Sequence, residues 1–159
     1  MKKKFPYKSI LIVCSVNTAR SPMAEGFLKN FFSKQNLDIK VSSGGISSHA
    51  RDGMLISMDA KLAMREIGIT LSDTYLSSDL KKHPDIIKRA DLILTLTEKH
   101  KEEVFSIITD NHKNVYTIKE FGGKVGDIKD PSMKELDGFR EARDEIIECL
   151  KNGLNKYSF

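Results

Sequence analysis

The sequence predicts a single α/β domain built on a four-stranded parallel sheet with helices on both faces. Residues 9–13 form a short, continuous apolar run, which is typical of a strand that is covered on both faces. Further short strand segments alternate along the chain with segments of helical periodicity, and such strands usually pair in parallel through right-handed crossovers. The length of 159 residues suits one domain, which we expect to span residues 1–159.

The first half of the chain reads as strand, helix, strand and helix. Residues 22–32 carry apolar side chains at helical spacing, and residues 38–41 are expected to form a short second strand. Residues 43–53 are rich in serine, glycine and polar residues and are expected to form a loop. Residues 54–67 are expected to form a helix that ends at Gly68 with a left-handed cap.

The second half continues the alternation. Pro84 suits the first turn of a helix. A long amphipathic pattern that includes Leu136, Phe139 and Ile146 lies near the end of the sequence. The predicted segments are helices over 80–89, 98–108 and 134–156, strands over 91–96 and 114–118, and a loop over 121–133.

Composition and charge argue against several classes of protein. No apolar stretch approaches membrane-spanning length, and no long apolar region follows the basic start Met1-Lys-Lys-Lys, so we expect neither a membrane partner nor a signal peptide. The net charge of +4 comes from scattered charges of both signs, so we expect no nucleic-acid partner. This balance suits an anionic substrate. Two cysteines make no disulfide framework, and we expect a cytoplasmic enzyme.

The stretch Cys14-Ser-Val-Asn-Thr-Ala-Arg20-Ser21 follows the first strand and leads into the first helix. Backbone N–H groups of such a loop can point inward at one anion, and the positive end of the helix dipole adds to the attraction. The same field favours the thiolate form of Cys14. Arg20 offers a planar fork for two phosphoryl oxygens, and the Ser21 hydroxyl can hydrogen-bond the sulfur. The pattern predicts a phosphate-binding loop with a cysteine nucleophile.

The alternative for this stretch is a buried thiol at the end of a strand, beside an arginine that is simply solvated. The strand before the loop and the helix start at Ser21-Pro22 favour the phosphate-binding loop.

An Asp-Pro pair supplies the candidate general acid. Alone, Asp130-Pro131 would indicate the opening of a turn. Beside a thiolate nucleophile, the leaving group needs a proton, and Asp130 can donate it if its carboxyl group is protonated at working pH. It would then act as base toward the water that hydrolyses the phosphoenzyme. Asp127 is the rival acid, and its alternative role is to cap backbone N–H groups.

The chain resembles the low-molecular-weight protein tyrosine phosphatase family over nearly its whole length. The family signature Cys-x-Gly-Asn-x-Cys-Arg-Ser-Pro-x-Ala-Glu is matched by Cys14-Ser-Val-Asn-Thr-Ala-Arg-Ser-Pro-Met-Ala-Glu25. Further landmarks are Ser43-Gly-Gly45, Ala90-Asp91-Leu-Ile-Leu and Asp130-Pro131. The resemblance implies four parallel strands flanked by helices and a phosphocysteine intermediate. It implies catalytic roles for Cys14, Arg20 and Asp130, and phosphate binding or loop support by Ser15, Val16, Asn17, Thr18, Ala19, Ser21 and Ser43.

Within the loop, the chain departs from the family at two positions. Val16 stands where the family has glycine, so this position is expected to keep an ordinary backbone conformation. Ala19 stands where many members have a second cysteine that can protect the nucleophile as a disulfide. The resemblance also implies that Asn17 holds the loop open with Ser43 among its partners, and asparagine tolerates a left-handed backbone. The alternatives are a plain turn residue and a strand-end hydroxyl.

The remaining titratable residues carry weaker signals. We expect solvated helix or loop positions for His49, His83, His100 and His112, which lack metal-ligand spacing, so we expect no metal and no cofactor. His49 lies in the loop that lines the substrate cleft in the family, and a substrate contact is the alternative for it. Cys149 is expected to be an inert, packed thiol.

Substrate choice depends on residues at the mouth of the loop. Ser132 stands where phosphotyrosine members carry an aromatic residue, whereas Thr18 resembles the bacterial protein-arginine phosphatase branch. A cleft aromatic could come instead from Phe121 or Tyr75. We favour phosphotyrosine-type monoesters on a protein or peptide, with phosphoarginine as the alternative, and we expect inorganic phosphate or other oxyanions to bind in the loop.

Two other classes are less favoured. Arsenate reductases share the fold and the loop but need further cysteines, and this chain offers Ala19 and the remote Cys149. A non-catalytic phosphate-binding module would be expected to lose Cys14 or Asp130, and both are present.

Overall fold

A four-stranded parallel sheet forms the centre of the protein, in a computed structural model that describes residues 1–109 and 113–159. The order across the sheet is β3 (Lys40–Gly45), β2 (Ser9–Cys14), β4 (Leu92–Thr95) and β5 (Asn114–Thr117). Neighbouring strands are parallel throughout, with Ile10 beside both Val41 and Leu92. These strands confirm the predicted α/β class and the predicted parallel sheet.

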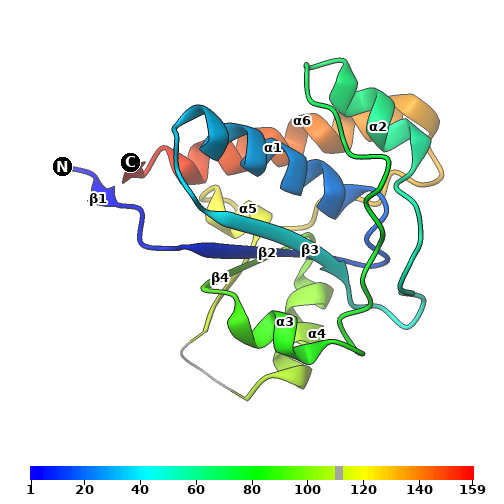
Figure 1. The fold of residues 1–159 in the computed structure, drawn as a ribbon, viewed down its shortest axis with the longest axis horizontal. Coiled ribbons are helices and arrows are strands. Elements are labelled where there is room, and N and C mark those ends of the chain that lie inside the picture. Colours follow the sequence, from blue (N-terminus) through cyan, green and yellow to red (C-terminus); the bar gives the residue numbers. More distant parts are fainter. Residues whose placement is uncertain (110–112) are drawn as a thin grey trace.

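Helices cover both faces of this sheet, as predicted (Figure 1). One face carries α1 (Arg20–Lys34), α2 (Met58–Arg65), the short α5 (Ile118–Phe121) and the long α6 (Glu135–Leu154). The other face carries α3 (Pro84–Arg89) and α4 (Glu98–Ile107). None of the helices in the described ranges is long and apolar enough to cross a membrane.

The alternation of side chains along β2 decides which face each residue reaches. Ile10, Ile12 and Cys14 join the core cluster that includes residues of α1, α2 and α6. Leu11 and Val13 join the cluster that includes residues of α3 and α4. Successive side chains of a strand point to opposite faces, so the parity of β2 places Cys14 on the α1 side of the sheet.

The sheet order also decides where a ligand can enter. The chain leaves β2, pairs β3 on one side of it, and then crosses to pair β4 on the other side. The carboxyl end of β2 is therefore the topological switch point, where a crevice opens in sheets of this kind. Cys14 is the last residue of β2 and lies at this point.

Some predicted boundaries were wrong. The second strand runs from Lys40 to Gly45 instead of 38–41, because the Ser-Gly segment that indicates a loop locally pairs along its whole length with β2. The predicted helix 54–67 shortens to α2, although Gly68 does take the left-handed conformation, with φ 81°. The predicted helix 80–89 begins only at Pro84.

Two features were missing from the prediction. Thr117 and Glu120 form a capping box that starts α5 directly after β5. The termini pair as a small parallel sheet of β1 (Lys3–Lys4) and β6 (Tyr157–Ser158), which brings the N- and C-termini together (Figure 1). Its strands are too short to show a periodic pattern.

His112, one of the predicted solvated histidines, lies outside the described residues.

Gly45 lies where the sheet touches the loop that follows β2. A Cβ atom at this position would lie 2.8 Å from the Ser15 carbonyl oxygen and 2.9 Å from the Val16 Cα atom. These are backbone atoms and cannot rotate away. Glycine is therefore required for close approach of the two segments.

We expect Gly45→Ala to lower the free energy of unfolding by about 1–3 kcal/mol, because the methyl group must displace backbone in a packed region. Urea unfolding followed by circular dichroism measures the change. Ser42→Ala, at an exposed position of the same strand, is the control and should leave stability nearly unchanged. Equal stability of the two variants would contradict this account of Gly45.

Candidate active site

The loop between β2 and α1 curls around its own first residue. Asn17 takes the left-handed conformation, with φ 65°, and its backbone N–H donates to Cys14 Sγ at 3.2 Å. Asparagine tolerates this conformation, whereas the neighbouring valine keeps negative φ, as the sequence predicted for Val16. The left-handed residue turns the backbone inward, so the loop closes over the sulfur.

The orientation of the Asn17 side chain follows from one unambiguous donor. The backbone N–H of Ser78 donates to Asn17 Oδ1 at 3.0 Å, so the amide nitrogen must face the other way. Its two N–H groups reach Ser21 Oγ at 2.8 Å and Ser43 Oγ at 2.9 Å. The bond from Asn17 to Ser43 is the one that the family resemblance implied.

This orientation determines the role of the Ser21 hydroxyl. Ser21 Oγ accepts from Asn17, so its own proton is free for Cys14 Sγ, which lies 2.8 Å away. Asn17 and Ser21 are fully buried and Cys14 nearly so, so water does not compete with these bonds. The chain of donors from Ser78 to the sulfur stabilises negative charge on the sulfur.

Glu25 and Tyr75, for which the sequence analysis predicted no supporting role, support this chain. The carboxylate of Glu25 accepts from Ser43 Oγ at 2.5 Å and pairs with Lys29 at 2.6 Å. The Tyr75 hydroxyl donates to Asn17 Oδ1 at 2.9 Å. Burial, followed by the nearby Glu25 charge, raises the pKa of Tyr75 above its ordinary value, so this hydroxyl remains a donor.

Both aromatic residues considered for the cleft make contacts within the protein. Tyr75 is held by its hydroxyl, which donates to Asn17, and Phe121 is 8% exposed in the core, against Gly153.

Glu25 stands within the quoted signature, so its position was visible in the sequence, but its role depends on β3 lying beside α1.

Arg20 is buried, with 5% of its surface exposed, so the alternative of a solvated arginine is wrong. Its Nη1 donates to the Ile128 carbonyl at 2.7 Å and its Nη2 to Ser15 Oγ at 3.3 Å. A guanidinium carries five N–H groups, so these two bonds leave three for an anion. Ala19 precedes the helix without a capping side chain, which leaves the positive end of α1 open to the same anion.

The two aspartates of the loop between α5 and α6 have different surroundings. Asp130 Oδ2 lies 4.0 Å from Arg20 Nη2, and the Asp130 side chain is 56% exposed. Its other oxygen accepts from the Ser132 N–H at 3.0 Å. Asp127 instead accepts from the Glu98 N–H at 2.9 Å, at the start of α4, which is the capping role foreseen as its alternative.

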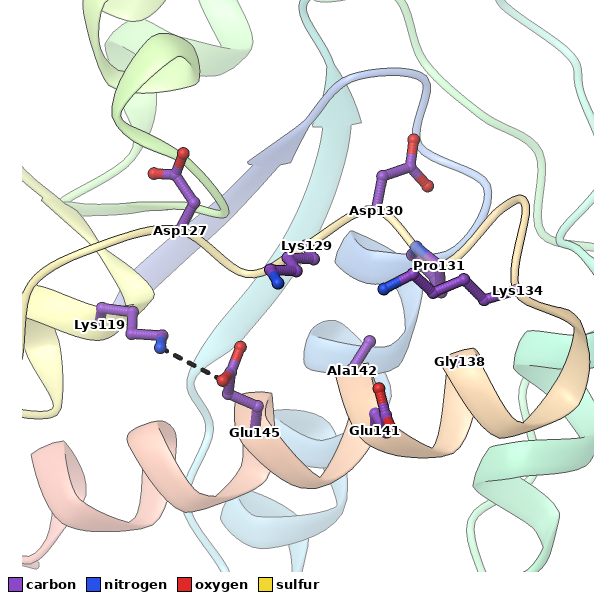
Figure 2. A pocket seen from close by; sticks show the side chains of 10 residues that line it. All are labelled: Lys119, Asp127, Lys129, Asp130, Pro131, Lys134, Gly138, Glu141, Ala142 and Glu145. Atoms are coloured by element: carbon purple, nitrogen blue, oxygen red, sulfur yellow. Dashed lines mark hydrogen bonds and ion pairs between the residues drawn. The ribbon is translucent and has the colours of Figure 1, made fainter.

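A cavity of about 230 Å³ lies on the other side of this loop, between it and α6. Figure 2 shows the Asp130 carboxylate pointing away from α6, while Lys119 and Glu145 form an ion pair on the α6 side. The cavity therefore lies behind the candidate acid and not between the acid and Cys14.

The histidines do not all behave as predicted. His100 is 3% exposed, so its predicted solvated position is wrong, and its Nε2 lies 2.8 Å from Ser15 Oγ. It is in the first turn of α4, whose start lies beside the carboxyl end of β4 and turns this side chain inward. Burial, and next the charge of Arg20, lowers the pKa of His100 to about 4.

The other two described histidines lie away from the loop. His83 pairs with Asp52 at 3.0 Å, and His49 is exposed in the loop after β3.

Thr18 lies in the loop, and the second cysteine lies in α6. Thr18 is half-buried, and its carbonyl accepts from the Ser57 N–H at 2.8 Å, which ties the loop to the segment before α2. Cys149 is 2% exposed in α6, and burial raises the pKa of its thiol, as suits a packed cysteine. Both cysteines are free thiols.

A cysteine at the base of an anion-binding loop, with a buried arginine above it and an aspartate at its mouth, defines a cysteine-dependent phosphatase of the α/β type. Residues 9–157 match the family described as low molecular weight phosphotyrosine protein phosphatase, and the chain belongs to this family.

Three similar proteins place the chain within the family. It is 34% identical to a protein-arginine-phosphatase of Bacillus subtilis, over 89% of this chain and 91% of that protein. It is 31% identical to the low molecular weight protein-tyrosine-phosphatase PtpB of Staphylococcus haemolyticus, over 89% and 94%. A solved mutant of the arginine phosphatase YwlE, with a phosphorylated active-site serine, superposes with a TM-score of 0.81 at 32% identity, covering 91% of each chain.

We expect Ser21→Ala to slow alkylation of Cys14 by iodoacetamide about tenfold at pH 7, because a hydrogen bond to a charged group contributes about 1.5–3 kcal/mol. Mass spectrometry of the labelled peptide measures the rate, in a Cys149→Ala background so that one thiol reports. Ser42→Ala is the control. An unchanged rate in Ser21→Ala would show that Ser21 does not stabilise the thiolate.

Proposed function

We propose that this protein is a cysteine-dependent protein phosphatase that hydrolyses phosphotyrosine-type monoesters through a phosphocysteine intermediate. The observation that carries the proposal is the buried chain from Ser78 through Asn17 and Ser21 to Cys14 Sγ, which is built to hold a negative sulfur. The partners are a phosphorylated protein or peptide and, in the loop, inorganic phosphate or another oxyanion. Two free cysteines suit a reducing compartment, so we also propose a cytoplasmic location.

In the first step, the Cys14 thiolate attacks phosphorus and the bond from phosphorus to the leaving oxygen breaks. The electron pair goes to that oxygen, which takes the proton of Asp130. The loop N–H groups and the free N–H groups of Arg20 stabilise the remaining phosphoryl oxygens, and this preorganised field supplies most of the acceleration. The exposure of Asp130 at the mouth of the loop suits contact with a leaving group that stays outside.

In the second step, water attacks the phosphorus of the phosphocysteine and the sulfur–phosphorus bond breaks. Asp130, now ionised, takes a proton from the water. The sulfur departs with the electron pair as a thiolate, and the Ser21 hydroxyl and the Asn17 N–H stabilise it. Inorganic phosphate leaves, and the free enzyme returns.

Phosphoarginine is the second candidate substrate, and Thr18 favours it. This half-buried residue belongs to the loop, and a hydroxyl there can hydrogen-bond a guanidinium leaving group or the attacking water. The reaction would break a phosphorus–nitrogen bond by the same thiolate attack. Phe121 is buried in the core, which removes one candidate aromatic wall for a phenyl ring.

The two less favoured classes lose support from the positions of their key residues. An arsenate reductase needs further thiols near the nucleophile, and the second cysteine of this chain is buried in α6. A non-catalytic module needs no acid at the mouth of the loop, yet Asp130 lies 4.0 Å from Arg20.

The proposed function predicts that Cys14→Ser abolishes turnover of para-nitrophenyl phosphate while the loop still binds inorganic phosphate. The wild-type enzyme, quenched with acid during turnover, should carry phosphate on Cys14 by mass spectrometry. Cys149→Ser is the control and should turn over normally. Turnover by the Cys14→Ser protein would rule out covalent catalysis by cysteine.

General acid catalysis by Asp130 predicts that Asp130→Asn slows substrates with basic leaving groups far more than substrates with acidic ones. A series of aryl phosphates of increasing phenol pKa measures the slope of log kcat/KM. Asp127→Asn should leave this slope unchanged, because Asp127 caps α4. The roles must be exchanged if only Asp127→Asn steepens it.

Substrate class is tested by the ratio of kcat/KM for a phosphotyrosine peptide and a phosphoarginine peptide. We expect the wild type to favour phosphotyrosine, and Thr18→Ile to raise the ratio by up to about fivefold through added apolar contact with the ring. Thr18→Ser keeps the hydroxyl and is the control. A wild-type preference for phosphoarginine that Thr18→Ile reverses would identify the second candidate as the substrate.

A further inference from the structure

His100 lies buried behind the phosphate-binding loop on an element that contributes nothing to the loop itself. It belongs to α4, on the face of the sheet opposite α1, and Nε2 of its ring reaches Ser15 Oγ at 2.8 Å. Its Nδ1 is buried and has no hydrogen-bond partner among the described residues. An unpaired polar atom in a core is unfavourable compared with an apolar side chain of similar size. Packing alone therefore does not explain a histidine here.

The bond to Ser15 places His100 one step from the phosphate-binding arginine. Ser15 Oγ accepts from Arg20 Nη2 at 3.3 Å and also forms the hydrogen bond with His100. The opposite end of the guanidinium is held by the Ile128 carbonyl at 2.7 Å. Arg20 is thus anchored between two supports, Ile128 and the pair of Ser15 with His100.

The surroundings of His100 favour its neutral form. Arg20 from α1 and Lys99 from α4 oppose a positive charge on the ring, and Asp127 and Asp130 from the following loop favour one. Burial and the Arg20 charge outweigh the two carboxylates, and the pKa falls to about 4. A second cation next to Arg20 is avoided at neutral pH.

We infer that His100 is a positioning residue whose neutral imidazole holds the Ser15 hydroxyl, which in turn orients the Arg20 guanidinium toward the phosphoryl group. This inference rests on the proposed function. Ser15 then does more than complete the loop, because its hydroxyl connects His100 of α4 to the guanidinium of Arg20. The support comes from one face of the sheet while the nucleophile lies on the other.

Two polar substitutions separate positioning from folding. His100→Gln can place a side-chain amide near the position of Nε2, whereas His100→Asn reaches only the position of Nδ1. We expect His100→Asn to lower kcat/KM for para-nitrophenyl phosphate about five- to tenfold and to weaken vanadate binding by a similar factor. His100→Gln should stay within about twofold of the wild type. His83→Gln, at the ion pair with Asp52, is the control histidine and should be neutral.

A double-mutant cycle tests the connection through Ser15. In a Ser15→Ala background, His100→Asn should change kcat/KM by less than about twofold, because the hydroxyl that it acts through is gone. An equal loss in both backgrounds, or equal rates for the Gln and Asn variants, would overturn the inference. In that case the wild type still forms phosphocysteine, whereas failure of the proposed function would remove the intermediate from the wild type as well.

Stability against pH tests the neutral state. The folded protein holds the His100 pKa at about 4, below its ordinary value of 6.5, so the unfolded chain binds the extra proton between these values. The wild type should therefore lose free energy of unfolding as pH falls from 6.5 toward 4, and His100→Gln should lose less. Equal losses in urea unfolding would contradict a buried neutral imidazole.

Discussion

The direction of the hydrogen bonds in the active-site loop is set at Asn17, whose Oδ1 accepts from the backbone N–H of Ser78. A backbone N–H can only donate, so this bond sets the orientation of the whole amide. The amide nitrogen then donates to Ser21 Oγ, and the Ser21 hydroxyl is the donor to the sulfur of Cys14 when that sulfur is ionised. Ser78 is not part of the loop itself and comes from the long segment between α2 and α3. The direction in which these hydrogen bonds run is thus set by a residue outside the loop.

The same loop is held from both faces of the sheet. On the α1 side, Glu25 and Tyr75 support Ser43 and Asn17. On the α4 side, His100 holds Ser15. Because β2 is central in the sheet, its carboxyl end has neighbours on both faces and both flanks, and a loop at this position can be supported in every direction. Rigid support of this kind is what electrostatic preorganisation requires, since donors that are already aligned need not reorganise during the reaction.

Close backbone approach is a further constraint on this geometry. Gly45 ends β3 against Ser15 and Val16, where no side chain fits. Within the predicted loop 43–53, residues 43–45 belong to β3, and Gly45 is required there for contact between the strand and the phosphate-binding loop, whereas residues 46–53 form no helix or strand. Local propensity was misleading here because glycine serves both turns and close approach. The short α5 was missed for the opposite reason, since a capping box at Thr117 starts a helix inside a run that reads as strand.

The sequence by itself determined the alternating elements and the parallel sheet. It also indicated the positions of Cys14, Arg20 and Ser21, because these residues depend on local order: a buried strand, a tight loop and a helix start. Tertiary structure alone decided the contacts of His100, Tyr75 and Ser78, and it separated Asp130 at the mouth of the loop from Asp127 at the start of α4. The physical reason is that a hydrogen bond between distant segments depends on how elements pack, and packing leaves no periodic signal in the sequence.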